Sequence, residues 1–332
     1  MKIKGSMKNL RINNAFTVAA AGTALALVIR LYQVFSGLID FETGFYNSSD
    51  ITVYLLYAIL ALTAISVFAI SFLTSEIPQE KMPEKKNMTV AVFAGIFAVT
   101  LVIEAVNQFG VFNDMYTSFH IAGSNYIIPA KDRYNLTFFM NSLPYITKSG
   151  ALPRLCEALF AALSTVYFLV LMLKYSGLRK FDIAKMKALS LCPLFWATFR
   201  LVERFTRTIS FMNVSSLFFE MFMIAFMMMF FMYFAQMSSK VNAVAISYKI
   251  FSYGLISAMF AAVVALPKII LTVVNSSYRD LMEAGSLACR PEWTDIAFCA
   301  FAAAFLVHCL SSARIKNMTL KETEKIIQKE EE

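Results

Sequence analysis

Residues 214–237 read VSSLFFEMFMIAFMMMFFMYFAQM, and Glu220 is the only charged side chain among them. A helix needs about 20 apolar residues to cross the roughly 30 Å hydrocarbon core of a bilayer, and this stretch is long enough. A mean hydropathy of +0.62 and a charged fraction of only 16% extend the pattern to the whole chain. The sequence therefore predicts an all-α membrane protein, with the lipid bilayer as its main partner.

Similar apolar stretches recur along the chain. They predict about eight transmembrane helices, at 15–38, 51–73, 88–109, 153–174, 186–208, 214–237, 248–273 and 293–312. Seven is the alternative count if one of these helices lies on the membrane surface. We expect a single polytopic domain over 1–312 and a charged cytoplasmic helix over 313–332. The aromatic-rich external segment 110–152 predicts interfacial helices or a lid over the bundle.

The net charge of +8 comes from an uneven distribution of Lys and Arg. Basic residues concentrate before the first predicted span, between the fourth and fifth spans, and in the tail, whereas the external segment DFETGFYNSSD at 40–50 has none. Because basic loops stay in the cytoplasm, this pattern predicts a multi-pass plasma-membrane protein with both termini inside. The charge is thus explained by orientation and by anionic lipid headgroups, and nucleic acid is not an expected partner.

The stretch FRLVERFTRTIS at 199–210 places charges inside a predicted span. A charged side chain at the bilayer centre costs on the order of 3 kcal/mol, so such side chains are expected to face the bundle interior or to pair. On the predicted topology, all the charges within the spans lie in the outer half of the membrane, where they form a polar layer. They are Arg30, Glu104, Glu157, Arg200, Glu203, Arg204, Glu220 and Lys268.

Helical spacing gathers part of this polar layer on single helix faces. Arg200, Glu203 and Arg204 are three and four residues apart, and Arg30 and Gln33 repeat the three-residue step on the first span. One interpretation is a transporter-like protein that binds a small polar or anionic solute in an outward-facing layer. The candidate ligand-binding residues are then Arg30, Gln33, Glu104, Glu157, Arg200, Glu203 and Glu220.

The alternative interpretation is structural. Equal numbers of acidic and basic side chains within the spans would cancel in a buried ion-pair network, as in a non-catalytic membrane scaffold or sensor subunit. Arg204 and Lys268 could also extend their charged ends toward the headgroups, because long basic side chains bury their stems and keep the charge in water.

Two internal similarities suggest a duplication. Residues 29–41, IRLYQVFSGLIDF, align with 199–211, FRLVERFTRTISF, and 153–163, PRLCEALFAAL, align with 291–301, PEWTDIAFCAF. These matches predict two parallel four-helix repeats, in halves 1–180 and 181–312. Chance similarity between apolar helices is the alternative.

Motifs for catalysis and metal binding are absent from the sequence. It has no zinc-protease, nucleophile-elbow, phosphate-loop or dinucleotide-binding motif. The only histidines are His120 and His308, and neither has a second His or a Cys at metal-ligand spacing. The sequence therefore predicts a protein that is not an enzyme and uses neither a metal nor a cofactor.

The segments RLYQVFSGLIDFETGFY at 30–46 and LCPLFWATFRLVERF at 191–205 carry a resemblance. They resemble a group of uncharacterised multi-pass membrane proteins of anaerobic Gram-positive bacteria. That group has an Arg-Leu helix end followed by a D-x-E-T-G turn, and a P-L-x-W motif before a second charged helix. The matching positions here are Asp40, Glu42, Thr43, Gly44, Pro193, Leu194 and Trp196. The resemblance implies location and fold, and no mechanism.

Overall fold

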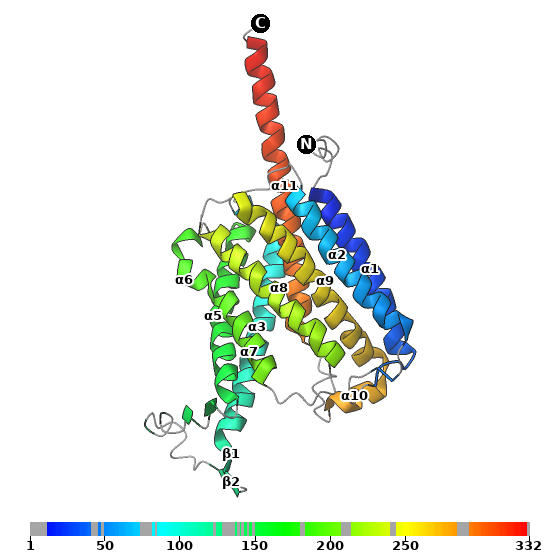
Figure 1. Ribbon diagram of the computed structural model, residues 1–332. Helices are drawn as coiled ribbons and strands as arrows, with labels where there is room; N and C mark the ends of the chain where they lie inside the picture. Colours follow the sequence, from blue (N-terminus) through cyan, green and yellow to red (C-terminus); the bar gives the residue numbers. More distant parts are fainter. Residues whose placement is uncertain are drawn as a thin grey trace.

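A computed structural model shows a bundle of long helices (Figure 1). It describes residues 12–40, 46–47, 50–73, 82–83, 85–121, 124–127, 137, 140, 143–144, 146–147, 150–179, 183–206, 214–239, 244–283 and 292–330. The helices of the bundle are α1 (Ile12–Phe35), α2 (Ile51–Leu73), α3 (Met88–Thr117), α5 (Ala151–Ser176), α7 (Cys192–Thr206), α8 (Val214–Ser238), α9 (Val244–Val274) and α11 (Trp293–Glu330).

Seven helices in the described part of the chain are long and apolar enough to cross a membrane, the pattern of a multi-pass membrane protein. These are all the bundle helices except α7. The span predicted at 186–208 is divided into the short α6 (Lys187–Ser190), a turn at Leu191 and α7. Pro193 stands in the first turn of α7, the one part of a helix that tolerates its missing N–H.

The helix α7 has only 15 residues, which corresponds to about 22 Å and is shorter than the hydrocarbon core. It packs against α5 and α8, and its Phe195, Val202 and Phe205 side chains are exposed. The described residues thus contain seven apolar helices of spanning length, the number of the alternative count, and an eighth crossing by α7 stays a prediction.

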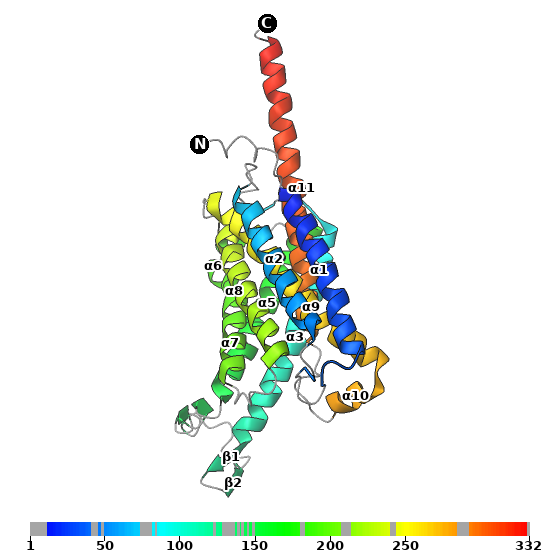
Figure 2. The same ribbon diagram turned by 45° about the vertical axis from the view of Figure 1, so that its right-hand side comes forward.

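The two ends of the bundle differ. In both views α1 begins, and α11 extends beyond the bundle, at the end opposite α10 (Ser276–Glu283) and the hairpin of β1 (Ser118–Ile121) and β2 (Ser124–Ile127) (Figures 1 and 2). The predicted charged tail is the continuation of α11, which runs without a break to Glu330. Most of 128–149 lies outside the described residues, so a lid or interfacial helices over 110–152 stay a prediction.

Aromatic side chains fill the centre of the bundle. The Phe97 ring of α3 lies edge-on to Phe168 of α5, with 4.7 Å between ring centroids, and within 6.3 Å of the rings of Trp196, Phe231 and Phe301. All five side chains are buried. An edge-to-face aromatic pair stabilises by about 0.5–1.5 kcal/mol beyond the contribution of its buried area. The cluster joins α3, α5, α7, α8 and α11, and through Trp196 it holds α7 in place.

The hairpin of α1 and α2 packs on α9. Its two helices approach closely at Gly22, where an added Cβ would overlap the Thr63 side chain. Small residues allow such approaches between membrane helices. Among the described residues, α1 packs on α2 and α3 on α5, as their counterparts α7 with α8 and α9 with α11 also do. The pair α2 and α3 makes no extensive contact, whereas its counterpart α8 and α9 packs closely. The duplication of two equivalent halves stays a prediction.

Candidate functional site

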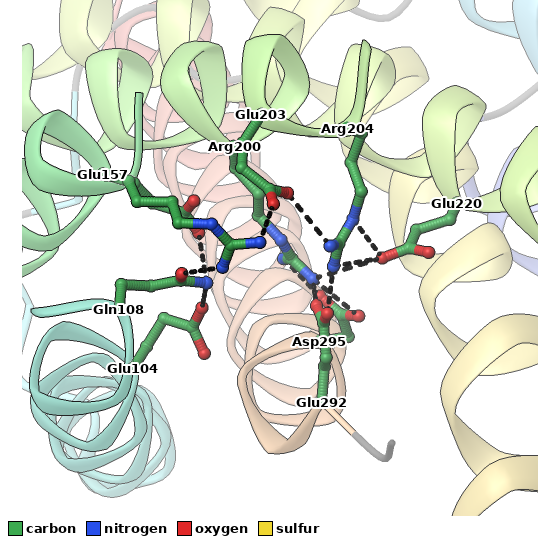
Figure 3. Close-up of polar contacts among 10 residues, drawn as sticks. Glu104, Gln108, Glu157, Arg200, Glu203, Arg204, Glu220, Glu292 and Asp295 are labelled. Atoms are coloured by element: carbon green, nitrogen blue, oxygen red, sulfur yellow. Dashed lines mark hydrogen bonds and ion pairs between the residues drawn. The ribbon is translucent and has the colours of Figure 1, made fainter. Parts of the chain in front are cut away.

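A connected group of charged and amide side chains joins five helices near the end of the bundle that carries α10 (Figure 3). We call it the polar network. Its members come from α3, α5, α7, α8 and the start of α11, and hydrogen bonds or ion pairs join them into one chain of contacts. They are Glu104, Gln108, Arg154, Glu157, Arg200, Glu203, Arg204, Glu220, Glu292 and Asp295.

Arg200 forms the central ion pair of the network. Its Nη1 donates to Asp295 Oδ1 at 2.6 Å and its Nη2 to Asp295 Oδ2 at 3.1 Å, a bidentate arrangement. The Arg200 side chain is 1% exposed and its guanidinium lies 5.6 Å from the Trp196 ring centroid. It also contacts Glu292. Asp295 stands in the first turn of α11, where the positive end of the helix dipole favours an acid.

The partner of Arg200 is not among the candidate residues chosen from sequence. Of the acids proposed as ligand-binding residues and described by the structure, only Glu220 comes within ion-pair distance of Arg200, at 4.0 Å from its Nη2. Glu292 lies one residue before the predicted span 293–312, and Asp295 lies in the first turn of that span, so neither is counted among the charges inside the spans. The sequence feature that could have indicated these partners is PEWTD at 291–295, where two acids follow a proline at a span boundary.

Arg204 is fully engaged in the interior. Its Nε donates to Glu220 Oε1 at 2.9 Å, its Nη1 donates to Glu203 Oε2 at 3.1 Å, and its Nη2 contacts Glu292. Only 3% of the residue is exposed. The expectation that Arg204 extends toward the headgroups is therefore wrong, because Glu203 of α7, Glu220 of α8 and Glu292 just before α11 hold its guanidinium inside the bundle.

The network continues to α3 and α5 through Arg154. Its Nη2 pairs with Glu203 Oε1 at 2.6 Å, and its Nη1 donates to Gln108 Oε1 at 3.1 Å. The amide nitrogen of Gln108 then donates to Glu104 Oε1 at 2.8 Å and to Glu157 Oε1 at 3.3 Å. In the sequence Arg154 lies at the external boundary of a predicted span, and nothing there indicates that it contacts other charged residues. Its role in joining the two parts of the network is evident only from the structure.

The signs in the network do not balance. Among the described residues, its members include the carboxyl groups of Glu104, Glu157, Glu203, Glu220, Glu292 and Asp295, but only the guanidinium groups of Arg154, Arg200 and Arg204. The expectation of equal charges that cancel is therefore wrong for this group. The difference arises because Glu292 and Asp295 join the network, with only Arg154 as an additional base, while Arg30 and Lys268 lie outside it.

Arg30 and Gln33 form a second, separate cluster at the end of α1. Arg30 Nη1 donates to Gln33 Oε1 at 3.3 Å and to the Tyr46 hydroxyl at 2.9 Å. Its guanidinium lies 5.7 Å from the centroid of the Phe219 ring on α8. Arg30 is 8% exposed and Gln33 is fully buried. The fold therefore brings Glu104, Glu157, Arg200, Glu203 and Glu220 together and keeps Arg30 and Gln33 apart from them.

Lys268 lies between the two groups. It interacts electrostatically with Glu220 and Asp295 of the network and with Arg30 of the second cluster. Within the described part of the chain, no carboxylate comes within ion-pair distance of either Lys268 or Arg30. Of the basic side chains predicted within the spans, Arg30 and Lys268 are therefore those that form no close ion pair with a described residue.

A third polar group lies at the opposite end of the bundle. His308 of α11 is within 2.9 Å of the Asn87 amide through Nδ1 and within 3.2 Å of the Lys85 carbonyl through Nε2. Asn87 Oδ1 accepts from the Val90 N–H and caps α3. Among the described residues no group of three His, Cys, Asp or Glu side chains is placed to hold a metal ion. The geometry of His308 fits a helix-joining role.

Comparisons of the chain with protein-family models, with curated proteins and with solved structures found no match. The resemblance to multi-pass proteins of anaerobic Gram-positive bacteria stays a prediction.

Proposed function

We propose that the chain is a transporter-like protein of the plasma membrane that binds a small anionic solute beside Arg30. The observation that carries the proposal is the buried Arg30 guanidinium, whose hydrogen bonds go only to the neutral Gln33 and Tyr46 among the described residues. A charge buried in a membrane is costly unless it is paired. An anion at this position would supply the missing partner.

The donors of Arg30 suit such a ligand. Its two protein hydrogen bonds both use Nη1, so Nε and Nη2 have no partner in the described part of the chain. A guanidinium presents these N–H groups in one plane, which matches the oxygens of a carboxylate or phosphate. Lys268, which also lacks an ion pair with any described residue, adds positive potential from α9. Arg200 and Arg204 are less suited, because carboxylates already occupy them.

The proposal is tested by the melting temperature of the purified protein in phosphate, sulfate, acetate, succinate and chloride. An anion present at about 100 times its Kd stabilises the folded state by about 2.7 kcal/mol. At least one anion should raise the melting temperature of the parent, and Arg30→Gln should abolish that rise. Arg279→Gln is the matched control, because Arg279 is an exposed arginine at the same end of the bundle. Equal responses of parent and Arg30→Gln to every anion would refute the proposal.

A second function has its own supporting observation. The buried, bidentate pair of Arg200 with Asp295 and the ion pairs of Arg204 join three helices, α7, α8 and α11, without a ligand. Such a network suits a non-catalytic scaffold or sensor subunit that needs a fixed helix arrangement. Under that function no anion stabilises the parent, so the melting-temperature experiment separates the two. Neither function needs a catalytic residue or a cofactor, in line with the sequence.

We also propose eight crossings with both termini in the cytoplasm. This is supported by the start of α1 and the extension of α11 lying at the same end of the bundle, which requires an even number of passes (Figures 1 and 2). The short α7 then crosses where the surrounding helices shield it or where the bilayer is locally thinner. Its charged side chains pair within the polar network and do not face lipid.

The topology predicts which introduced cysteines react from outside. In intact cells an impermeant maleimide should label Asn125→Cys, in β2, and should not label Ser239→Cys, after α8, until the membrane is permeabilised. The parent protein measures the background from native cysteines. Labelling of Ser239→Cys in intact cells, or protection of Asn125→Cys, would contradict this orientation.

A further inference from the structure

The carboxyl groups of Glu104 and Glu157 share one donor. Gln108 Nε2 lies 2.8 Å from Glu104 Oε1 and 3.3 Å from Glu157 Oε1, so a single amide group joins two acids on α3 and α5 (Figure 3). Two carboxylates that approach a common group repel each other when both are ionised, and a proton on one of them removes the repulsion.

The second oxygen of Glu157 has no partner among the described residues. Glu157 is 1% exposed, and its Oε2 is a buried atom without a hydrogen bond to any of them. An ionised carboxylate accepts from several donors, so a buried oxygen with none is expensive as an anion. The same oxygen costs less as the hydroxyl of a neutral carboxylic acid, which leaves one O–H donor unsatisfied instead of a buried charge.

The nearest arginine on the same helix does not compensate Glu157. Arg154, one turn earlier on α5, uses Nη1 for Gln108 and Nη2 for Glu203. The other charged groups that act on Glu157 are Glu104 from α3 and Arg200, Glu203 and Arg204 from α7. Both of these α7 arginines form close pairs with other acids. The third helix packed on α5, α6, lies at the opposite end of the bundle (Figure 1).

From this geometry we infer that Glu157 is a proton-binding site, with Gln108 and Glu104 as the groups that position its carboxyl. The Glu157 carboxylate takes a proton from water and becomes a neutral acid with its O–H at Oε2, and it returns the proton to water on release. A proton fits better than a metal ion, since the described residues hold no group of three ligands. Proton relays in membrane proteins use buried acids of this kind.

The site also gives the proposed transporter a coupling ion. If an anion binds beside Arg30, a proton carried at Glu157 would offset its charge during transport. That coupling rests on the proposed function, whereas proton binding itself does not. If no anion binds but Glu157 is found protonated, the proposed function is refuted and this inference still stands.

Infrared spectroscopy of the purified protein tests the inference directly. A protonated carboxyl has a carbonyl band separate from that of carboxylates and shifts in D₂O. The parent should show this band at neutral pH, and Glu157→Gln, which keeps the shape and neutrality of the protonated acid, should lose it. Asp114→Asn removes an exposed acid from α3 and should leave the band unchanged.

A second variant guards against failure of Glu157→Gln to fold. Glu104→Gln removes the negative charge beside Glu157, so this variant should still show the carbonyl band. When the buffer is made more alkaline, the band should disappear at a lower pH in Glu104→Gln than in the parent. Absence of the band in the parent overturns the inference. So does a band that survives in folded Glu157→Gln, or one whose pH dependence is unaffected by Glu104→Gln.

Discussion

Arg200→Ala is expected to destabilise the protein by about 3–5 kcal/mol, the usual cost of removing one partner of a buried ion pair. The substitution leaves Asp295 buried without the two hydrogen bonds that Arg200 gives it. Asp295 is 1% exposed, so water does not replace them. The loss is measurable as the free energy of unfolding in mixed micelles, and as a fall in the amount of protein inserted in cells.

The partner variants separate charge from packing. Arg200→Leu combined with Asp295→Leu removes both charges, and Glu292 keeps its contact with Arg204. This double variant should recover much of the stability, because two apolar side chains can replace a buried pair. Arg179→Ala removes an exposed arginine outside the bundle and should change little. A double variant no more stable than Arg200→Ala would show that the Arg200–Asp295 pair is not the source of the loss.

Phe97→Ala is expected to cost about 3 kcal/mol, toward the low end for a buried aromatic side chain. In the unfolded state within a membrane, Phe97 contacts lipid and not water, so the hydrophobic free energy of leaving water does not contribute to stability. The expected loss of stability comes from the cavity and from the lost van der Waals contacts. Phe97 contacts rings on α5, α7, α8 and α11, including Phe168 and Trp196. Its removal should therefore also loosen α7, which the aromatic cluster contacts through Trp196.

The matched control for this prediction lies on the same helix. Val99 is 59% exposed and faces away from the aromatic cluster, so Val99→Ala should be nearly neutral. The melting temperatures of both variants and the protease sensitivity of the segment before α7 provide the measurement. Equal effects of Phe97→Ala and Val99→Ala would mean that the aromatic cluster does not hold the bundle together.

The sequence by itself determined the class of fold and the positions of the apolar helices. The span expected at 51–73 forms α2 with those bounds, and the span expected at 214–237 differs from α8 by one residue. These predictions succeed because about 20 apolar residues can leave water only as a helix with all its backbone hydrogen bonds made internally. Arg200, Glu203 and Glu220 are likewise expected in the interior from sequence alone, since each would be costly in lipid.

Only the tertiary structure decided which charges meet. Arg200 pairs with Asp295, 95 positions along the chain, and Arg30 stays with neutral partners although the internal similarity aligns it with Arg200. Helix order is not encoded in any local pattern: α1 and α2 pack on α9, which removes Arg30 from the acids of α3 and α5. Hydropathy depends on each residue alone, whereas an ion pair depends on the rotation and neighbours of two helices. Those are set by how the aromatic core packs.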